Sequence, residues 1–364
     1  MLNYTDKLPI LIYMTLTELN YYVRKFAPFA AIGFLAFVVF YFLIMAVLSS
    51  LSRSQPTTPI YNPIFGKISK MKTSASIDYP SNASFSLDTI EGKPISASDS
   101  AKVYFIPSKP VRFGYTQTST LIAKTLDFDT DVVKYKTSPD DPTWISFTDE
   151  EKALKIDISN FNFEYKLNYE NNPDIFNGSV LPSDDVIYEN ARQFLRAINR
   201  YPDELVRGRQ EIIYLQFEPT INDFIVVKTP EEANLAEVDF FRSDIDGNPL
   251  LPPKYFSSQN YVVMIFRDQN YKVIKSQIKQ YDFDKQNFGI YPIKNGDEAF
   301  AELTSGKGII VSSGKNSNQI SINKLLFGYY DPDEIQDYLQ PIYVFLGKNG
   351  FAAYVPAVRN EYLE

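Results

Sequence analysis

The 364-residue sequence contains no cysteine and no histidine. Without cysteine it has no disulfide, no thiolate nucleophile and no sulfur-rich zinc site. Without histidine it lacks the commonest general base and the commonest ligand of transition metals. Catalysis would therefore rest on carboxylates, lysine, tyrosine or serine alone, and we expect a protein that binds rather than an enzyme.

The net charge of −8 is spread unevenly along the chain. Residues 1–25 carry +1 and residues 53–72 carry +4, which leaves −13 on residues 73–364. An acidic folded part repels phosphate backbones, so we expect no nucleic-acid partner. The basic residues 53–72 suit a position over anionic lipid headgroups.

One long uncharged segment stands near the N-terminus. Residues 26–52 contain no charged side chain, and Phe29–Leu48 is apolar throughout. At a rise of about 1.5 Å per residue this length crosses a hydrocarbon core of about 30 Å. The sequence therefore predicts a tail at 1–25 and a transmembrane helix at 26–52 that binds the lipid bilayer. The alternatives are a buried core helix and a cleaved signal peptide, although the run is longer than an ordinary signal-peptide core.

The charges beside this segment bear on its orientation. Arg24 and Lys25 lie directly before it, whereas Arg53 and later lysines follow it. The nearest charges favour a cytoplasmic N-terminus and an extracytoplasmic C-terminal domain in the cell membrane. The apolar residues 8–16 are too short to span and are expected to lie at the membrane interface.

The remaining chain shows a linker followed by folded sequence. Residues 53–75 combine three prolines with serine, threonine and lysine, which predicts a semi-extended stalk. Aromatic residues make up 15% of the chain, enough apolar surface for a sizeable core. From its length we expect two domains, a first α+β domain at 76–205 and a second β-rich domain at 206–364.

Alternating apolar and polar residues predict most of the strands. Phe161, Phe163, Tyr165, Leu167 and Tyr169 alternate with polar residues, as in a strand with one buried face. Residues 154–158 and 143–147 follow the same pattern and are expected to pair with it in an antiparallel sheet. A second β region comprises residues 211–216, 224–227, 236–241, 261–266 and 271–274, with a hairpin turn at 267–270.

Near the C-terminus, Lys348, Asn349 and Gly350 separate the apolar runs 341–346 and 351–355, which predicts a hairpin because Asn-Gly tolerates positive φ. Helices are expected at 184–198, 119–127 and 297–305, the last ended by Gly306. The order of helix, strands, helix, strands suggests a duplicated helix-plus-meander unit. The predicted fold class is α+β, with antiparallel sheets and a few short packed helices.

Two loops look like ligand-binding motifs but depart from them. Gly308–Ser317 is similar to a phosphate-binding loop, yet its spacing is wrong and serine does not follow Lys315. Asp244–Asn248 resembles the start of a calcium loop, but its glycine comes too early and Tyr255 replaces the bidentate acid. Both are expected to be ordinary turns.

Other candidate side chains also have ordinary explanations. The Ser/Lys pairs lie in glycine-flanked turns, the adjacent acids suit helix starts and loops, and the glycan sequons are close to chance. The pairs are Ser305/Lys307 and Ser313/Lys315, the acids are Asp184/Asp185, Glu231/Glu232 and Asp333/Glu334, and the sequons begin at Asn82 and Asn177. The sequence therefore assigns no catalytic, cofactor-binding or metal-binding residue, and no cofactor is expected.

The C-terminal part of the chain nevertheless has a recognisable layout. It consists of residues 291–294, 297–306, 320–330, 339–345 and 353–357, with a looser echo at 121–167. This layout is similar to PepSY-type modules and to the YycH/YycI class of bacterial membrane-anchored regulators. The resemblance implies a single-anchor, extracytoplasmic protein that binds a sensor kinase or a peptidase and carries no catalytic residues. Residues 211–283 are not part of that pattern.

Together these observations predict a membrane-tethered, non-catalytic binding or regulatory protein of the bacterial envelope. Its partner is expected to be another membrane or envelope protein, contacted through sheet edges and exposed aromatic side chains. The alternatives are a structural component of an envelope or secretion assembly and, third, an envelope hydrolase using carboxylates or a Ser/Lys pair.

Overall fold

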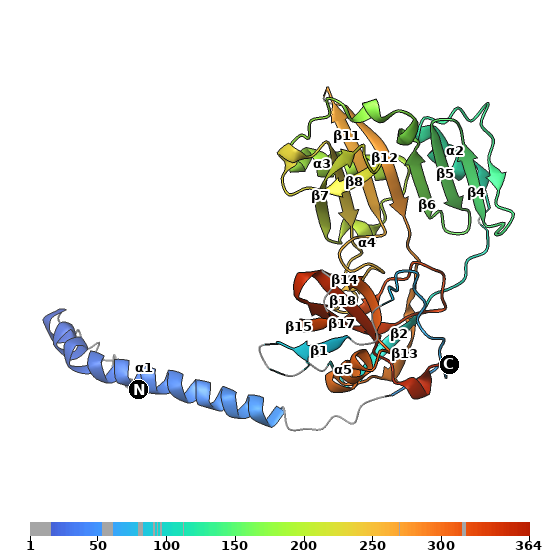
Figure 1. The fold of residues 1–364 in the computed structure, drawn as a ribbon. Helices are drawn as coiled ribbons and strands as arrows, with labels where there is room; N and C mark the ends of the chain where they lie inside the picture. Colours follow the sequence, from blue (N-terminus) through green and yellow to red (C-terminus); the bar gives the residue numbers. More distant parts are fainter. Residues whose placement is uncertain are drawn as a thin grey trace, which may run out of the picture. The chain divides into compact units, whose positions relative to one another are not determined.

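The computed structural model describes residues 16–52, 61–78, 83–89, 92, 94, 97–111, 113–268, 270–314 and 318–364. The chain divides into two compact units, Met1–Pro59 and Ile60–Glu364. The fold class predicted from the sequence is confirmed, since one apolar N-terminal helix precedes antiparallel sheets and a few short helices (Figure 1).

The first unit is one helix, α1 (Leu16–Ser52). Its segment Arg24–Leu48 is long and apolar enough to cross a membrane, and none of the most apolar part is buried. The helix begins before the expected position 26, so residues 16–25 of the expected tail are helical. Residues 1–15, which contain most of the predicted interfacial segment, lie outside the described residues.

Nine strands of the second unit form one large sheet in the order β3-β4-β5-β6-β12-β11-β9-β7-β8. All neighbouring strands in it are antiparallel. The strands are β3 (Lys136–Thr137), β4 (Trp144–Thr148), β5 (Lys152–Asp157), β6 (Phe163–Leu167), β7 (Gln210–Glu218), β8 (Asp223–Val226), β9 (Leu235–Phe240), β11 (Tyr261–Arg267) and β12 (Asn270–Ile278).

This sheet corrects the expected boundary at residue 205. β6 lies before that position and β12 after it, yet the two pair in register from Lys166↔Lys275 to Phe163↔Ile278. The predicted first domain and most of the second β region therefore form one body, here called the first lobe. Alternation shows which face of a strand is buried, but it does not show which strand lies beside it.

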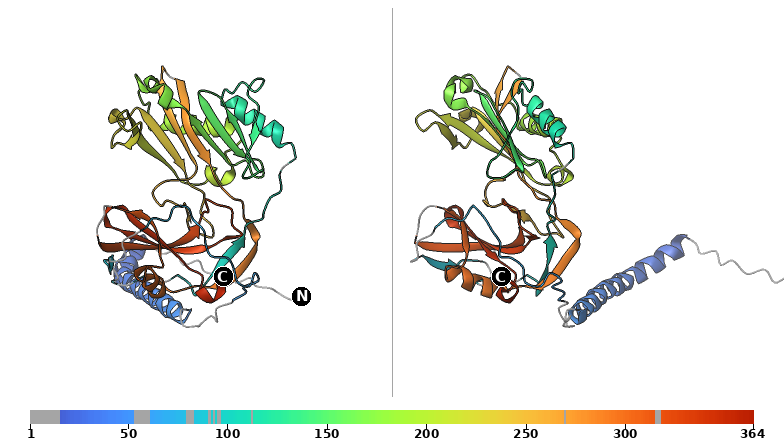
Figure 2. Two further views of the ribbon diagram at one scale, coloured as in Figure 1. Left: turned by 45° about the vertical axis from the view of Figure 1, so that its right-hand side comes forward. Right: turned by 90° about the vertical axis from the view of Figure 1, so that its right-hand side faces the viewer.

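Helices cover one face of the large sheet. α2 (Tyr115–Thr125) and α3 (Asp184–Ala197) pack with the short α4 (Asp203–Val206) on a core that includes Phe163, Val238 and Val262. The predicted apolar face of α3 is buried as expected, from Ile187 to Leu195. In the right-hand view of Figure 2 these helices lie on one side of the sheet.

Two further sheets form the second lobe. The mixed sheet has six strands, in the order β1-β15-β17-β18-β14 with β10 also beside β15, and the small sheet has three, in the order β13-β2-β16. β1 and β10 run parallel to β15. The strands are β1 (Ser84–Leu87), β2 (Ser100–Phe105), β10 (Leu250–Leu251), β13 (Asp284–Pro292), β14 (Ile309–Ser313), β15 (Gln319–Tyr330), β16 (Tyr338–Leu339), β17 (Pro341–Gly347) and β18 (Phe351–Pro356).

Local signals in the second lobe act as the sequence predicts. Asn349 and Gly350 have φ of 62° and 83° in the turn between β17 and β18, so the predicted hairpin is confirmed. α5 (Gly296–Thr304) starts with a capping box in which Asn295 accepts from the Glu298 backbone N–H at 2.8 Å. The duplicated unit is not evident, because β3 to β6 lie in chain order whereas β14 lies beside β18.

Part of the expected stalk at 53–75 belongs to the folded body. Residues 53–60 lie outside the described residues, but Ile68 and Met71 are buried. Asn62 forms a β-bridge to Ile290, and Ile68 forms one to Leu363. Residues 61–75 lie along the second lobe with a turn at 64–65, and the lobe offers backbone partners that composition alone does not reveal.

A long loop from the first lobe completes the second. It runs from β9 to β11 and places β10 beside Tyr329 and Tyr330 of β15. The hydroxyl of Tyr354 donates to the carbonyl of Pro252 in this loop at 2.7 Å. The two lobes therefore share a hydrogen-bonded sheet.

Candidate functional site

The face of the large sheet opposite α2 and α3 carries a row of polar side chains. Each member is the cross-strand partner of the next, so the row passes without a gap over eight neighbouring strands. The members are Lys136, Ser146, Lys155, Glu164, Gln277, Tyr261, Asp239 and Glu211. Asp239 is fully buried, and the other members of the row are at least partly accessible to solvent, so the stretch from Lys136 to Tyr261 is a surface available to a ligand.

Two hollows lie along this row. One, of about 490 Å³, is lined by the first four members of the row together with Trp144. The other, of about 350 Å³, is lined by Gln277, Tyr261 and Glu237 and by residues of the β9–β11 loop. Glu164 of the first hollow and Gln277 of the second are cross-strand partners. The two hollows are therefore neighbours on this face, and we call them together the sheet groove.

A pair of carboxyl groups lies at one end of the sheet groove. Glu237 and Asp239 are two residues apart in β9 and face the same way, and Asp239 is fully buried. Burial raises the pKa of both groups, and the charge of Glu237 raises the pKa of Asp239 further. One oxygen of Asp239 accepts from the Ser258 backbone N–H at 2.7 Å, while Oδ1 has no donor in the described part of the chain. Since the pKa of both groups is raised, we infer that a proton held between them supplies that donor.

This pair predicts a pH dependence of stability. Because the folded pKa is raised, the pair contributes its full stability below about pH 4, where unfolded carboxyls are also protonated, and loses it as the pH rises. Asp239→Asn should therefore gain stability over the wild type with rising pH, by up to about 1.4 kcal/mol per pH unit. Denaturant unfolding between pH 5 and 9 measures this difference. The exposed Asp140→Asn should show a constant difference, and a flat profile for Asp239→Asn would contradict the shared proton.

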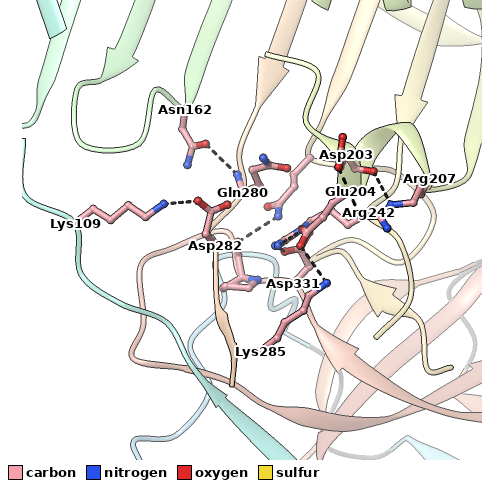
Figure 3. A network of polar contacts seen from close by, with 12 residues as sticks. Lys109, Asn162, Asp203, Glu204, Arg207, Arg242, Gln280, Asp282, Lys285 and Asp331 are labelled. Atoms are coloured by element: carbon pink, nitrogen blue, oxygen red, sulfur yellow. Dashed lines mark hydrogen bonds and ion pairs between the residues drawn. The ribbon is translucent and has the colours of Figure 1, made fainter. Parts of the chain in front are cut away.

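A buried ion cluster joins the two lobes (Figure 3). The Arg242 side chain is fully buried and donates to Glu204 of α4 at 2.9 and 2.5 Å and to Asp331, which follows β15, at 2.6 Å. Burial lowers the pKa of Arg242, but the charges of Asp331 and Glu204 outweigh it and raise the net value, so the guanidinium stays charged. Since a guanidinium so enclosed has no room for substrate, we interpret the cluster as a structural joint.

One edge of the large sheet presents aliphatic side chains to solvent. β8 pairs with β7 on one side and has no strand on the other within the described residues. Ile221 in the preceding turn is 60% exposed, and Val226 at the end of β8 is 73% exposed. The opposite edge strand, β3, has only Lys136 and Thr137. A strand edge with exposed aliphatic residues is a template for pairing with another chain.

The structure does not gather into one site the candidate side chains that the sequence analysis names. Ser305 donates to the Glu302 carbonyl, and Lys315 and Ser317 lie outside the described residues. Asp244–Asn248 is a turn closed by a bridge between Ile245 and Asn248, as predicted. Asn82 also lies outside the described residues, whereas Asn177 is exposed.

In two of the three pairs of adjacent acids, one member accepts a hydrogen bond from a tyrosine. Asp184 accepts from the Tyr214 hydroxyl at 2.8 Å, and Asp333 is buried and accepts from Tyr330 at 2.8 Å. Glu231 and Glu232 belong to an exposed turn. Within the described residues no group of three acidic side chains gathers to hold a metal ion.

Reasoning from the sequence missed Glu237, Asp239 and Trp144 as a common surface. A signal was present, because Glu237 and Asp239 alternate with Val238 and Phe240 in an otherwise apolar strand. Acids at every second position of a buried strand face one side together. No comparable signal shows that Trp144 lies on the same face, since β4 and β9 are far apart in the chain.

The structure defines an α+β protein with an N-terminal apolar helix. No protein-family model matches the chain, and no curated protein matches its sequence. Among solved structures, an uncharacterized protein from Eubacterium rectale ATCC 33656 is similar at a TM-score of 0.39 and 13% identity, over 74% of this chain and 87% of that one. The C-terminal domain of YpeB from Bacillus megaterium is similar at a TM-score of 0.29 and 12% identity, over 68% and 95%.

At such TM-scores neither similarity bears on function. The resemblance of the C-terminal residues to PepSY-type modules stays a prediction.

Proposed function

We propose that this chain is a membrane-tethered, non-catalytic binding protein of the bacterial envelope that pairs with another membrane or envelope protein. The anchor is the segment 26–52 within α1, with the N-terminus in the cytoplasm and the second unit outside it. The protein regulates or assembles its partner and does not transform a substrate.

The observation that carries this proposal is the β8 edge. Its unpaired backbone groups can extend the large sheet into a partner strand, and Ile225 and Val226 provide apolar contact beside them. Ordinary solvent-facing edges carry lysine, proline or bulges that prevent such pairing. β8 has none of these in its four residues. A partner strand there would bury side chains that solvent now contacts.

A photo-crosslinking residue at position 226 of the full-length chain tests the proposal in membranes of producing cells. We expect a discrete covalent adduct with one membrane or envelope protein, and we expect Val226→Lys to reduce co-purification of that protein about tenfold or more. Val132 is the matched control, since it is 77% exposed and lies outside the strands. Adducts of equal yield at positions 132 and 226, or none at 226, would refute the role of β8.

A further inference from the structure

Three lysines line the smaller hollow of the sheet groove, which we call the lysine hollow. Lys275 lies in β12, Lys279 directly follows that strand, and Lys254 belongs to the β9–β11 loop. Lys275 and Lys279 are half-buried, and Lys254 is exposed. Residues 73–364 carry a net charge of −13, so three lysines around one hollow of about 350 Å³ run against the charge of the domain.

None of these three ammonium groups has an ion-pair or hydrogen-bond partner among the residues that the structure describes. Other lysines of the chain do have one. Lys102 pairs with Asp246 at 2.8 Å, and Lys294 pairs with Glu302 at 2.9 Å. A half-buried ammonium group without a counter-ion is costly, so a bound anion would stabilise all three lysines.

The two acids that line the lysine hollow already have partners. Asp333 is buried and accepts from the Tyr330 hydroxyl at 2.8 Å and from the Ser74 backbone N–H at 3.1 Å. Glu237 interacts with Asp239, and the proton held between them leaves that pair one negative charge. Three positive charges against these two negative ones leave an excess of one positive charge in the hollow.

The free polar groups of the lysine hollow are mainly hydrogen-bond donors. The hydroxyls of Tyr261 and Ser257 line it, are half-buried and have no hydrogen-bond partner within the described residues. The amide of Gln277, in contrast, is already used, because its Nε2 donates to the Gln259 carbonyl at 2.9 Å. Ammonium and hydroxyl donors around a positive hollow suit an oxyanion.

The lysine hollow also has an aromatic end. Phe224 lines it from β8, whereas Lys275 lines it from β12, and β11, β9 and β7 lie between these two strands. The Phe224 ring is held by Tyr169 and Phe176, with ring centroids 5.0 and 5.8 Å away. A volume of about 350 Å³ is at the lower end of the range for ligand pockets. The hollow therefore suits a small molecule that is anionic at one end and apolar at the other.

We propose that the lysine hollow binds a small organic anion with a single carboxylate and an apolar body. The carboxylate lies among the three lysines and accepts from the Tyr261 hydroxyl, and the apolar body packs toward Phe224. One negative charge cancels the excess of one positive charge, whereas a phosphate monoester, with about −1.5 to −2 charges at pH 7, exceeds it. The carboxylate belongs either to a free acid or to the C-terminus of a peptide.

This proposal does not depend on the role of the β8 edge. The edge pairs through backbone groups with a partner protein, whereas the hollow binds through side chains and needs no partner. The full-length chain, purified in detergent micelles, is therefore sufficient for the test.

The test compares two ligands that differ in one charge. The protein at pH 7 is titrated with N-acetylphenylalanine and with its neutral amide while the heat of binding is measured, and empty micelles serve as the blank. We expect saturable binding of one acid molecule per chain. We expect the amide to bind at least about tenfold more weakly, because it lacks the charge that the lysines stabilise.

Lys279→Met tests the assignment to the lysines, because it removes the charge and keeps an apolar stem. We expect it to weaken binding of N-acetylphenylalanine about tenfold. Lys272→Met is the matched control and should leave binding unchanged, since Lys272 is an exposed lysine of the same strand that lines a different hollow. Trp144, the sole tryptophan, reports by its emission in denaturant whether a variant is folded. If Lys279→Met does not fold, Lys254→Met takes its place.

Two further ligands define the bound group. Benzoate that binds as tightly as N-acetylphenylalanine supports a free acid as the ligand, and weaker binding of benzoate supports a peptide C-terminus. Tighter binding of phenyl phosphate than of either acid would overturn the assignment to a single carboxylate. No saturable heat with either acid, equal affinities for N-acetylphenylalanine and its amide, or an unchanged affinity in the folded lysine variant would overturn the site itself.

Discussion

Replacing Arg242 with methionine should lower the free energy of unfolding by about 3 to 5 kcal/mol. The change leaves the buried carboxylate of Asp331 without its counter-charge, at a point where water cannot replace it, whereas Glu204 is partly exposed and keeps Lys285 at 3.9 Å. The large effect arises from the unpaired buried charge of Asp331 more than from the lost attraction. Denaturant unfolding of the full-length protein in micelles, followed by Trp144 emission, measures it.

The exposed pair between Arg207 and Asp203 is the matched control for this prediction. Asp203 is the first residue of α4 and Arg207 directly follows the helix, and their charged groups are 4.0 Å apart. Arg207→Met should cost less than about 1 kcal/mol, because solvent screens the pair. Equal and small losses for both arginine variants would show that the buried cluster is not a structural joint.

Adding one methyl group at Gly208 should be almost as damaging. A Cβ there would overlap the backbone carbonyl of Phe241 and lie 3.0 Å from the carbonyl of Glu204. Both contacts are backbone carbonyl oxygens. The N–H of Phe241 donates to the Arg209 carbonyl at 2.9 Å, and the Glu204 carbonyl accepts from the Ser243 N–H at 3.0 Å, so both residues are held in place. Neither can move without separating α4 from β9. Gly208→Ala should therefore cost about 3 kcal/mol, the upper range for an overpacked site.

The control for Gly208 is Gly178→Ala. Gly178 has a φ of 73° and open space around it, so its variant incurs only the backbone strain of about 1 to 2 kcal/mol. Unfolding midpoints of the two variants, measured side by side, separate steric overlap from strain. A cost at Gly208 no larger than that at Gly178 would mean that the junction yields easily.

Local features of the fold were predictable from the sequence. The alternation through Phe163, Tyr165 and Leu167 predicts β6, in which these residues are buried. Asn349-Gly350 predicts the hairpin turn between β17 and β18. α3 buries the face that its periodicity marks, from Ile187 to Leu195. These signals work because side-chain period and turn conformation are set by residues close together in the chain.

Long-range features were not predictable, and the candidate site is one of them. The pairing of Ser84 with Gln319 joins two strands with most of the chain between them. The polar row depends on the register of eight strands, and each strand contributes a single residue. A polar residue on a strand looks the same in the sequence whether it faces bulk water or a groove. Only the strand order distinguishes the two cases.

The insertion of β10 into the mixed sheet has a mechanical consequence. Tilting the first lobe against the second would break the ladder between Leu250, Leu251 and β15, and it would also pull Arg242 from between its two acids. The two lobes of residues 61–364 should therefore move as one rigid body, without a hinge between them. A force applied at the β8 edge would then be transmitted to Tyr61, and it would not be absorbed by rotation of one lobe against the other.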